Sequence, residues 1–147
     1  MQRKEIIKKL KNNYFNLKEL VCPHVYKKYG DKAWMFLDTN YLHCLLVIRE
    51  LLDVPMVCNN NTYTQRGLRC NICNLVKNKT APYMSAHILG KGGDFSSGKM
   101  SAEQMREKIK ENADLLPCNI RMEDDVNWLH FDVYDEGKDL KIREFKV

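Results

Sequence analysis

The sequence predicts an α+β fold in which an antiparallel sheet is flanked by helices. Apolar residues recur at helical spacing early in the chain, whereas three short runs with strand character lie between residues 119 and 146. This order is typical of α+β domains rather than of parallel α/β sheets. The 147 residues, 44% of them hydrophobic, suffice for one core. We therefore expect a single domain over residues 1–147, in which residues 1–14 can form a basic helical appendage.

Two helices and a strand are predicted in the amino-terminal part. Residues 3–12 place three apolar side chains on one stripe, which is the pattern of a surface helix. A core helix is expected to begin at Thr39, a candidate N-cap, and to continue to Leu52. Pro55 ends the helical pattern, and residues 54–58 then have the character of a short buried strand.

The rest of the chain predicts a long loop, one helix and three strands. Residues 59–84 contain many polar residues and a glycine, and their hydrophobic residues show only weak periodicity. A loop of that length in a small domain is usually functional. Ser101 to Gln104 form a capping box that opens a helix ending before Pro117. The strands are predicted over residues 119–122, 128–134 and 140–146, and their polar connections favour an antiparallel meander.

Composition excludes several classes of protein. No run approaches the roughly 20 apolar residues of a membrane-spanning helix, so no membrane insertion is expected. The amino terminus lacks the apolar stretch and cleavage site of a secretory signal, so we expect a chain made in the cytoplasm, with its six cysteines reduced. The net charge of +5 is mild and no nucleic-acid reader motif is present, so nucleic acid is not an expected partner. We expect a monomer.

Metal-ligand chemistry is concentrated around a glycine-rich turn. His87 and Asp94 lie on either side of it, and both side chains are good zinc ligands. Strand alternation after residue 126 places His130 and Asp132 on the face opposite the core. Two imidazoles and one carboxylate with an open fourth position are typical of a catalytic zinc site. Spacing alone leaves the alternative that His87 caps a turn and His130 is an ordinary strand residue.

The same segment resembles the S-x-H-x-x-G-x-A-x-D signature of the D-alanyl-D-alanine carboxypeptidase family of zinc peptidases, which share their fold with the hedgehog signalling domain. Ser85, His87, Gly90 and Asp94 fall on the fixed positions, and Gly92 replaces the usual alanine.

Two further motifs follow the order found in this family. The tripeptide from Trp128 to His130 resembles the later W-x-H element, in which the final histidine is the third ligand. Upstream, the run Gln-Arg-Gly-Leu-Arg resembles the S-G-x-R element and places Gly67 and Arg69 on its fixed positions. The resemblance extends from about Phe15 to the carboxyl terminus.

The resemblance implies one zinc ion per chain, held by His87, Asp94 and His130, with a water in the open position. Zinc lowers the pKa of such a water to about 7 and polarises the scissile carbonyl. The resemblance implies that Arg69 binds a substrate carboxylate or the oxyanion of the reaction, with Arg66 as the fallback.

Two further polar residues lie beside these ligands. Ser85 is expected to contribute to substrate binding and to support a ligand, and Asp132 can hydrogen-bond to a ligand from outside the site. The alternative is that both residues only form local hydrogen bonds within the turn and the strand.

The general acid/base is the least determined role. Family members commonly place a Glu or His three residues before the third ligand, where this chain has Asn127. Asp125 and Asp124 match the spacings of other branches, and Glu123 is also near. We favour Asp125 over the other two carboxylates.

The resemblance implies hydrolysis of a peptide bond in a bacterial peptidoglycan stem peptide, most simply at a terminus ending in D-alanine. The small size and missing signal favour a bacteriophage product that acts on the cell wall after lysis or from the virion. Two alternatives remain open. One is an endopeptidase of the same fold, which would be an endolysin. The other is an inactive zinc-containing binding or structural module of a phage particle.

A second cysteine motif lies outside the resemblance. Cys70 and Cys73 form a lone C-x-x-C, and a structural zinc site would need two more ligands. Cys58 or His24 would have to come from far away in the chain to complete it. We therefore predict that these cysteines, like Cys22, are packed free thiols.

Overall fold

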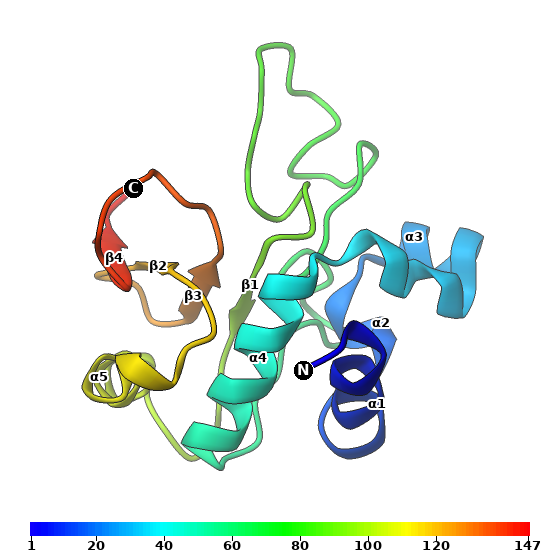
Figure 1. Cartoon of the computed structure of the whole chain (residues 1–147). Helices are drawn as coiled ribbons and strands as arrows, with labels where there is room; N and C mark the ends of the chain where they lie inside the picture. The colour runs from blue at the N-terminus through cyan, green and yellow to red at the C-terminus, as the bar shows by residue number, and fades with distance from the viewer.

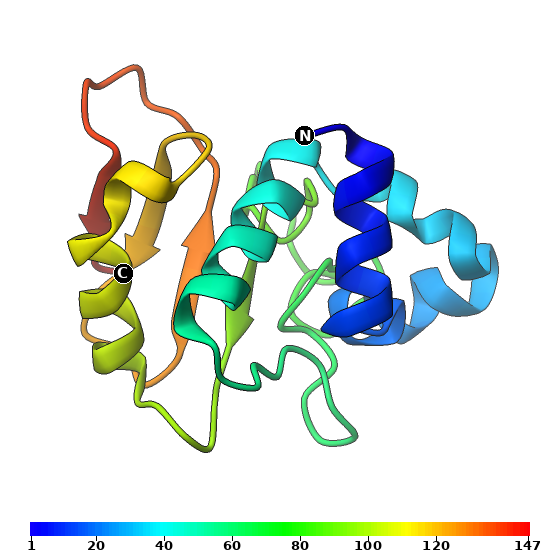
Figure 2. The same cartoon turned by 60° about the horizontal axis from the view of Figure 1, so that its bottom comes forward.

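A four-stranded mixed sheet lies on one side of the molecule, and helices cover one of its faces (Figure 1, Figure 2). The computed structural model describes all residues from 1 to 147. In chain order the elements are α1 (Arg3–Asn13), α2 (Leu17–Leu20), α3 (Pro23–Tyr29), the 3-10 helix η1 (Gly30–Phe36), α4 (Thr39–Leu52), β1 (Gly92–Phe95), α5 (Ala102–Glu111), the 3-10 helix η2 (Ala113–Leu115), β2 (Ile120–Glu123), β3 (Leu129–Asp132) and β4 (Ile142–Phe145).

The α+β class is confirmed, but the purely antiparallel meander is wrong. The strand order is β1-β3-β2-β4, and only the pairs β1–β3 and β2–β3 are antiparallel. After β3 the chain crosses to the far side of β2, so β4 pairs parallel to β2. Ion pairs join Glu136 of this crossover to Arg121 of β2 and to Arg143 of β4. Alternation along one strand predicts that it is a strand but does not predict its neighbour.

Two predictions about strands are corrected. The segment 54–58 is no strand of the sheet, because it contributes only an isolated bridge between Val57 and Ser96. Conversely, β1 lies within the segment that the sequence presents as a glycine-rich turn. Glycine has low strand propensity, so the pairing of Gly92 and Gly93 with β3 follows from the partner strand rather than from local preference.

The sheet has two chemically different faces. Phe95, Met122 and Phe131 point to one side and are fully buried in the core, where α5 packs against β3. On this side the rings of Tyr41 and Phe131 lie 5.4 Å apart, which ties α4 to the central strand. Alternation then directs Asp94 and the other intervening residues of each strand to the opposite face, as the sequence predicts for β3.

The predicted helices are confirmed, with one corrected cap. The side chain of Asp38, not Thr39, accepts hydrogen bonds from the first backbone amides of α4. Thr39 instead accepts a hydrogen bond from Arg3, and α1 packs against α4 with Ile6 and Leu10 fully buried. The capping box at Ser101 is present.

Helices α2 and α3 were not predicted, although each carries a start signal. Asn16 and Glu19 form a reciprocal capping box at α2. Pro23 occupies the first turn of α3, where its missing amide costs nothing. Both helices are too short to show a hydrophobic period, which explains why pattern reasoning passes over them.

The segment 59–84 contains no helix and no strand of the sheet, as predicted. Part of it, drawn in green, extends away from the sheet and helices in Figure 1, whereas Asn59 and Leu68 are hydrogen-bonded to α2. One isolated bridge, between Val21 and Leu68, attaches it to the amino-terminal part of the chain.

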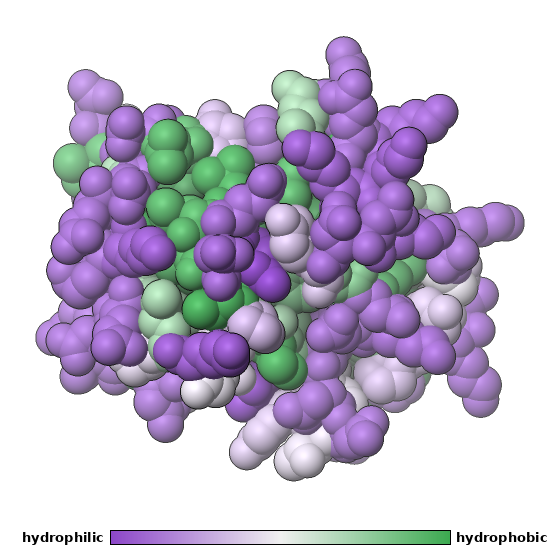
Figure 3. Space-filling view, turned by 90° about the horizontal axis from the view of Figure 1, so that it is seen from below, coloured by the Kyte–Doolittle hydropathy of each residue, from purple (hydrophilic) through white to green (hydrophobic).

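The surface is mainly hydrophilic on the face seen from below. Figure 3 shows hydrophobic residues exposed on that face chiefly on the side where Figure 1 has α5. No helix combines the length and the hydropathy needed to span a bilayer.

Gly90 is required by the packing of the chain before β1. Its φ of 67° lies in the left-handed region, and a Cβ there would lie 1.9 Å from the carbonyl oxygen of Phe36. Gly90→Ala is expected to lower the free energy of unfolding by about 2 kcal/mol or more, measured by urea denaturation. The matched control is Gly98→Ala, because no atom lies within 4 Å of the added Cβ. Equal stability of the two variants would contradict this account.

Candidate metal centre

Three side chains converge where β1 and β3 meet the turn before β1. The ligand atoms of His87, Asp94 and His130 all lie within 4.8 Å of one another. His87 Nε2 is 3.3 Å from Asp94 Oδ2, and His130 Nδ1 is 2.7 Å from Asp94 Oδ1. The structure therefore brings together the three residues predicted as metal ligands, in a group that could hold a metal ion.

Backbone pairing places these ligands. Asp94 lies directly opposite His130 in the antiparallel pair of β1 and β3, so their side chains share a face of the sheet. His87 approaches from the preceding turn, and its carbonyl accepts a hydrogen bond from the Arg69 amide. His87 Nδ1 donates to the carbonyl oxygen of Gly67 at 2.9 Å, which leaves Nε2 free to bind a metal.

A buried carboxylate orients the third ligand. His130 Nε2 donates to Asp132 Oδ2 at 2.8 Å, so Nδ1 faces Asp94. Asp132 is fully buried and accepts two hydrogen bonds from Arg121, at 2.8 and 2.9 Å. Such a partner fixes the tautomer and the ring orientation of a ligating histidine. The predicted contact of Asp132 with a ligand is thus present.

Gly92 makes room for this carboxylate. A Cβ on Gly92 would lie 2.6 Å from the Cβ of Asp132 and 2.9 Å from the carbonyl oxygen of Phe131. Because of this close approach, only glycine fits at position 92 without moving β3.

The two facing side chains perturb each other's protonation. Burial raises the pKa of Asp94, but hydrogen bonds with His130 and His87 outweigh it and hold that pKa well below its usual range. Burial lowers the pKa of His130, whereas hydrogen bonds with Asp132 and Asp94 outweigh it and raise the pKa to about 9. Asp94 is therefore an ionised carboxylate at neutral pH, whereas His130 carries a proton that a bound metal ion has to displace from Nδ1.

The donor set fits zinc. In a tetrahedral zinc site the nitrogen and oxygen ligands lie about 3.4 Å apart, given metal–ligand distances of about 2.0–2.2 Å. The separation of His87 and Asp94, 3.3 Å, matches this value. The 2.7 Å hydrogen bond between His130 and Asp94 has to open by several tenths of an ångström to admit the ion.

A cleft of about 370 Å³ leads to the three ligands. Its walls include Arg69, Ser85, Glu123 and Trp128. Arg69 donates from Nε to the carbonyl oxygen of Gln65 at 2.6 Å, and its Nη2 lies 3.9 Å from Asp94 Oδ2. A guanidinium so close to the ligands is positioned to bind an anionic group there.

The other predicted residues of this region have local roles. Ser85 Oγ accepts a hydrogen bond from the His87 amide at 3.3 Å, so this serine supports the turn as well as lining the cleft. The fallback Arg66 does not line the cleft and instead stacks over the ring of Tyr63.

The structure does not bring Asp125 to the ligands. Asp125 is exposed, has a φ of 62°, and lines a different cavity. Asp124 Oδ1 lies 4.0 Å from Arg106 Nε and is also absent from the cleft walls. The preference for Asp125 over its neighbours is therefore not supported by the geometry.

Of the three candidate carboxylates, only Glu123 lines the cleft. Met122 pairs with Phe131, so the register continued by one residue places Glu123 opposite His130. The carboxylate on the face of His130 cannot be found by counting residues back along the sequence. Side-chain alternation does not continue through the turn between β2 and β3.

A second group of ligand-type side chains also converges. Cys22, His24, Cys70 and Cys73 place one ligand atom each within 4.8 Å of the others. The prediction of separately packed thiols did not foresee this group, and Cys58 is not part of it. The structure thus holds two groups that could hold a metal ion, where one was expected.

No family model, no curated protein and no solved structure matches the chain.

Proposed function

We propose that this chain is a zinc-dependent peptidase that cleaves a stem peptide of bacterial peptidoglycan. The observation that carries the proposal is the convergence of His87, Asp94 and His130 at a cleft that also presents a guanidinium and a free carboxylate. Three protein ligands with an open fourth position characterise catalytic rather than structural zinc sites. The cell-wall substrate rests on the resemblance of the motifs to D-alanyl-D-alanine carboxypeptidases.

The bound metal would supply an activated water and polarise the scissile carbonyl. Arg69 binds the substrate carboxylate or the developing oxyanion, because its planar charged group lies beside the ligands. Glu123 accepts a proton from the attacking water and passes it to the leaving amine. Asp132 and Arg121 keep the ring of His130 in its ligating orientation throughout.

Mass spectrometry of defined muropeptides tests the proposal. Zinc-loaded protein is expected to remove one alanine residue from an uncross-linked stem peptide that ends in D-alanyl-D-alanine. A chelated sample should leave all masses unchanged, and added zinc should restore the loss.

Two other results would change the conclusion. Cleavage of a larger piece, or of cross-linked material only, would make the protein an endopeptidase. Unchanged masses with zinc demonstrably bound to His87 and its partners would overturn the proposed peptidase.

A further inference from the structure

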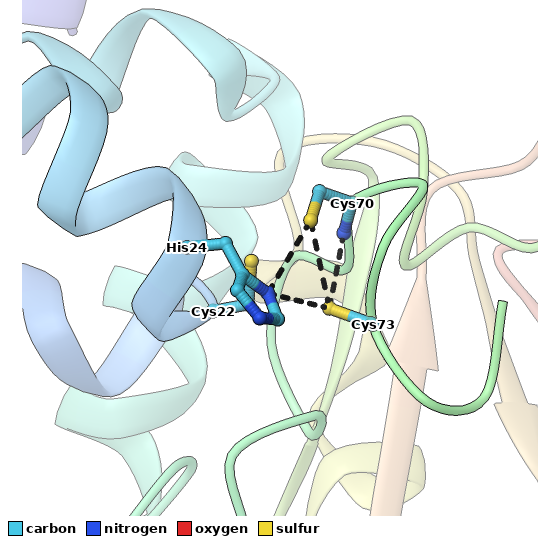
Figure 4. Close-up of side chains that lie close together, drawn as sticks. All are labelled: Cys22, His24, Cys70 and Cys73. Carbon is cyan, nitrogen blue, oxygen red and sulfur yellow. Dashed lines mark hydrogen bonds between the residues drawn. The ribbon is translucent and has the colours of Figure 1, made fainter. Parts of the chain in front are cut away.

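Four side chains from two distant parts of the chain meet away from the cleft (Figure 4). Cys22 is the N-cap of α3 and His24 lies in the first turn of that helix. Cys70 and Cys73 come from a turn in the long segment between α4 and β1. Three thiols and one imidazole therefore face one another across the boundary between a helix and an irregular loop.

The spacing of three of these atoms matches a tetrahedral metal site, and Cys22 Sγ lies within 4.8 Å of each of them. Zn–S bonds of about 2.3 Å and Zn–N bonds of about 2.0–2.1 Å place sulfur atoms about 3.8 Å apart, and sulfur and nitrogen about 3.6 Å apart. The Sγ atoms of Cys70 and Cys73 are 3.8 Å apart. His24 Nδ1 lies 3.5 Å from Cys70 Sγ and 3.8 Å from Cys73 Sγ.

Backbone hydrogen bonds hold the two parts in this position. The Leu68 amide donates to the Leu20 carbonyl at 2.9 Å, and the Cys22 amide donates to the Leu68 carbonyl at 2.9 Å. The Cys70 amide donates to Cys73 Sγ at 3.3 Å, which ties the two cysteines of the turn to each other. The arrangement is thus set by the main chain and not only by flexible side chains.

We infer that Cys22, His24, Cys70 and Cys73 bind a structural zinc ion. Three thiolates and one imidazole form one of the closed, four-ligand sets typical of structural zinc, and thiolate ligands favour zinc over hard cations. The ion would fasten the loop to the start of α3. The loop itself contains no helix and no strand of the sheet.

A zinc ion at this position would also help to position the backbone beside the cleft. Cys70 directly follows Arg69, and Gly67, whose carbonyl orients His87, lies three residues before Cys70. Zinc bound by the cysteines therefore positions the backbone that supports the other site, without touching the substrate.

Zinc content of two variants tests the inference independently of peptidase activity. His87→Ala removes a ligand of the cleft site, so the full-length variant should retain one zinc ion per chain by native mass spectrometry. Adding Cys70→Ser and Cys73→Ser should reduce that content to none. Cys118→Ser is the matched control. Cys118 is also partly exposed, but its Sγ lies 3.4 Å from Cys44 Sγ and outside the group of four ligands. This variant should leave the zinc content unchanged.

A labelling measurement on the unmodified chain covers the case in which the double serine variant does not fold. Cys70 is partly exposed, so zinc should protect it from a maleimide and a chelator should expose it. Cobalt in place of zinc should give the charge-transfer absorption of thiolate ligands. A zinc-free His87→Ala chain, or equal labelling of Cys70 with and without chelator, would overturn the inference.

Discussion

His87→Ala is expected to abolish peptide hydrolysis and to remove the zinc ion of the cleft. Loss of a hydrogen-bonding partner behind a ligand typically lowers metal affinity by about 10–100-fold. Loss of the ligand itself should therefore lower it by at least about 100-fold. Metal competition with a chelator measures the affinity, and muropeptide mass spectrometry measures the hydrolysis. The zinc ion inferred at the cysteines should remain, so zinc content should fall from two ions to one.

His43→Ala is the matched control for this prediction. His43 lies on α4, is half-buried and belongs to neither ligand group. It should keep both metal ions and full activity. Wild-type hydrolysis by His87→Ala would show that the reaction does not depend on this site.

Glu123→Gln should keep the cleft metal and lose most of the activity. The amide has the size of the carboxylate but cannot accept the proton of the attacking water. A positioned general base typically contributes about 10²–10⁴-fold to a rate, so kcat should fall by that factor. Zinc content and the urea unfolding curve should match those of the unmodified protein, because Glu123 is not one of the three residues of the ligand group.

Asp125→Asn separates the two candidate carboxylates. Asp125 is exposed and lies outside the cleft, so this variant should hydrolyse muropeptides at the original rate. The opposite pattern, an active Glu123→Gln and an inactive Asp125→Asn, would return the acid/base role to the residue that the sequence favoured.

Local patterns predicted much of the site. Alternation in β3 correctly separates His130 and Asp132 from the core residues, because the side chains of a strand point to opposite faces whatever its partners are. The motif around His87 and Asp94 likewise brings both side chains to one point.

Features that depend on contacts between residues far apart in the sequence could not be predicted from local patterns. The parallel pairing of β4 with β2 depends on a crossover that leaves no periodic signal. The role of Glu123 depends on where β2 ends and the turn begins, and strand boundaries are the least certain part of any pattern. Cys22 and Cys70 are 48 positions apart in the chain, and backbone hydrogen bonds at Leu68 help to bring them together.

The two-faced sheet also has a consequence for protein engineering. Arg121 and Glu123 of β2, and Arg143 and Phe145 of β4, alternate with residues that face the helices. A combinatorial library at position 145, with Glu123 kept, would alter the cleft wall while the buried Ile120 and Met122 of β2 stay unchanged. The side chain that faces the cleft can therefore be varied without changing the buried residues of β2.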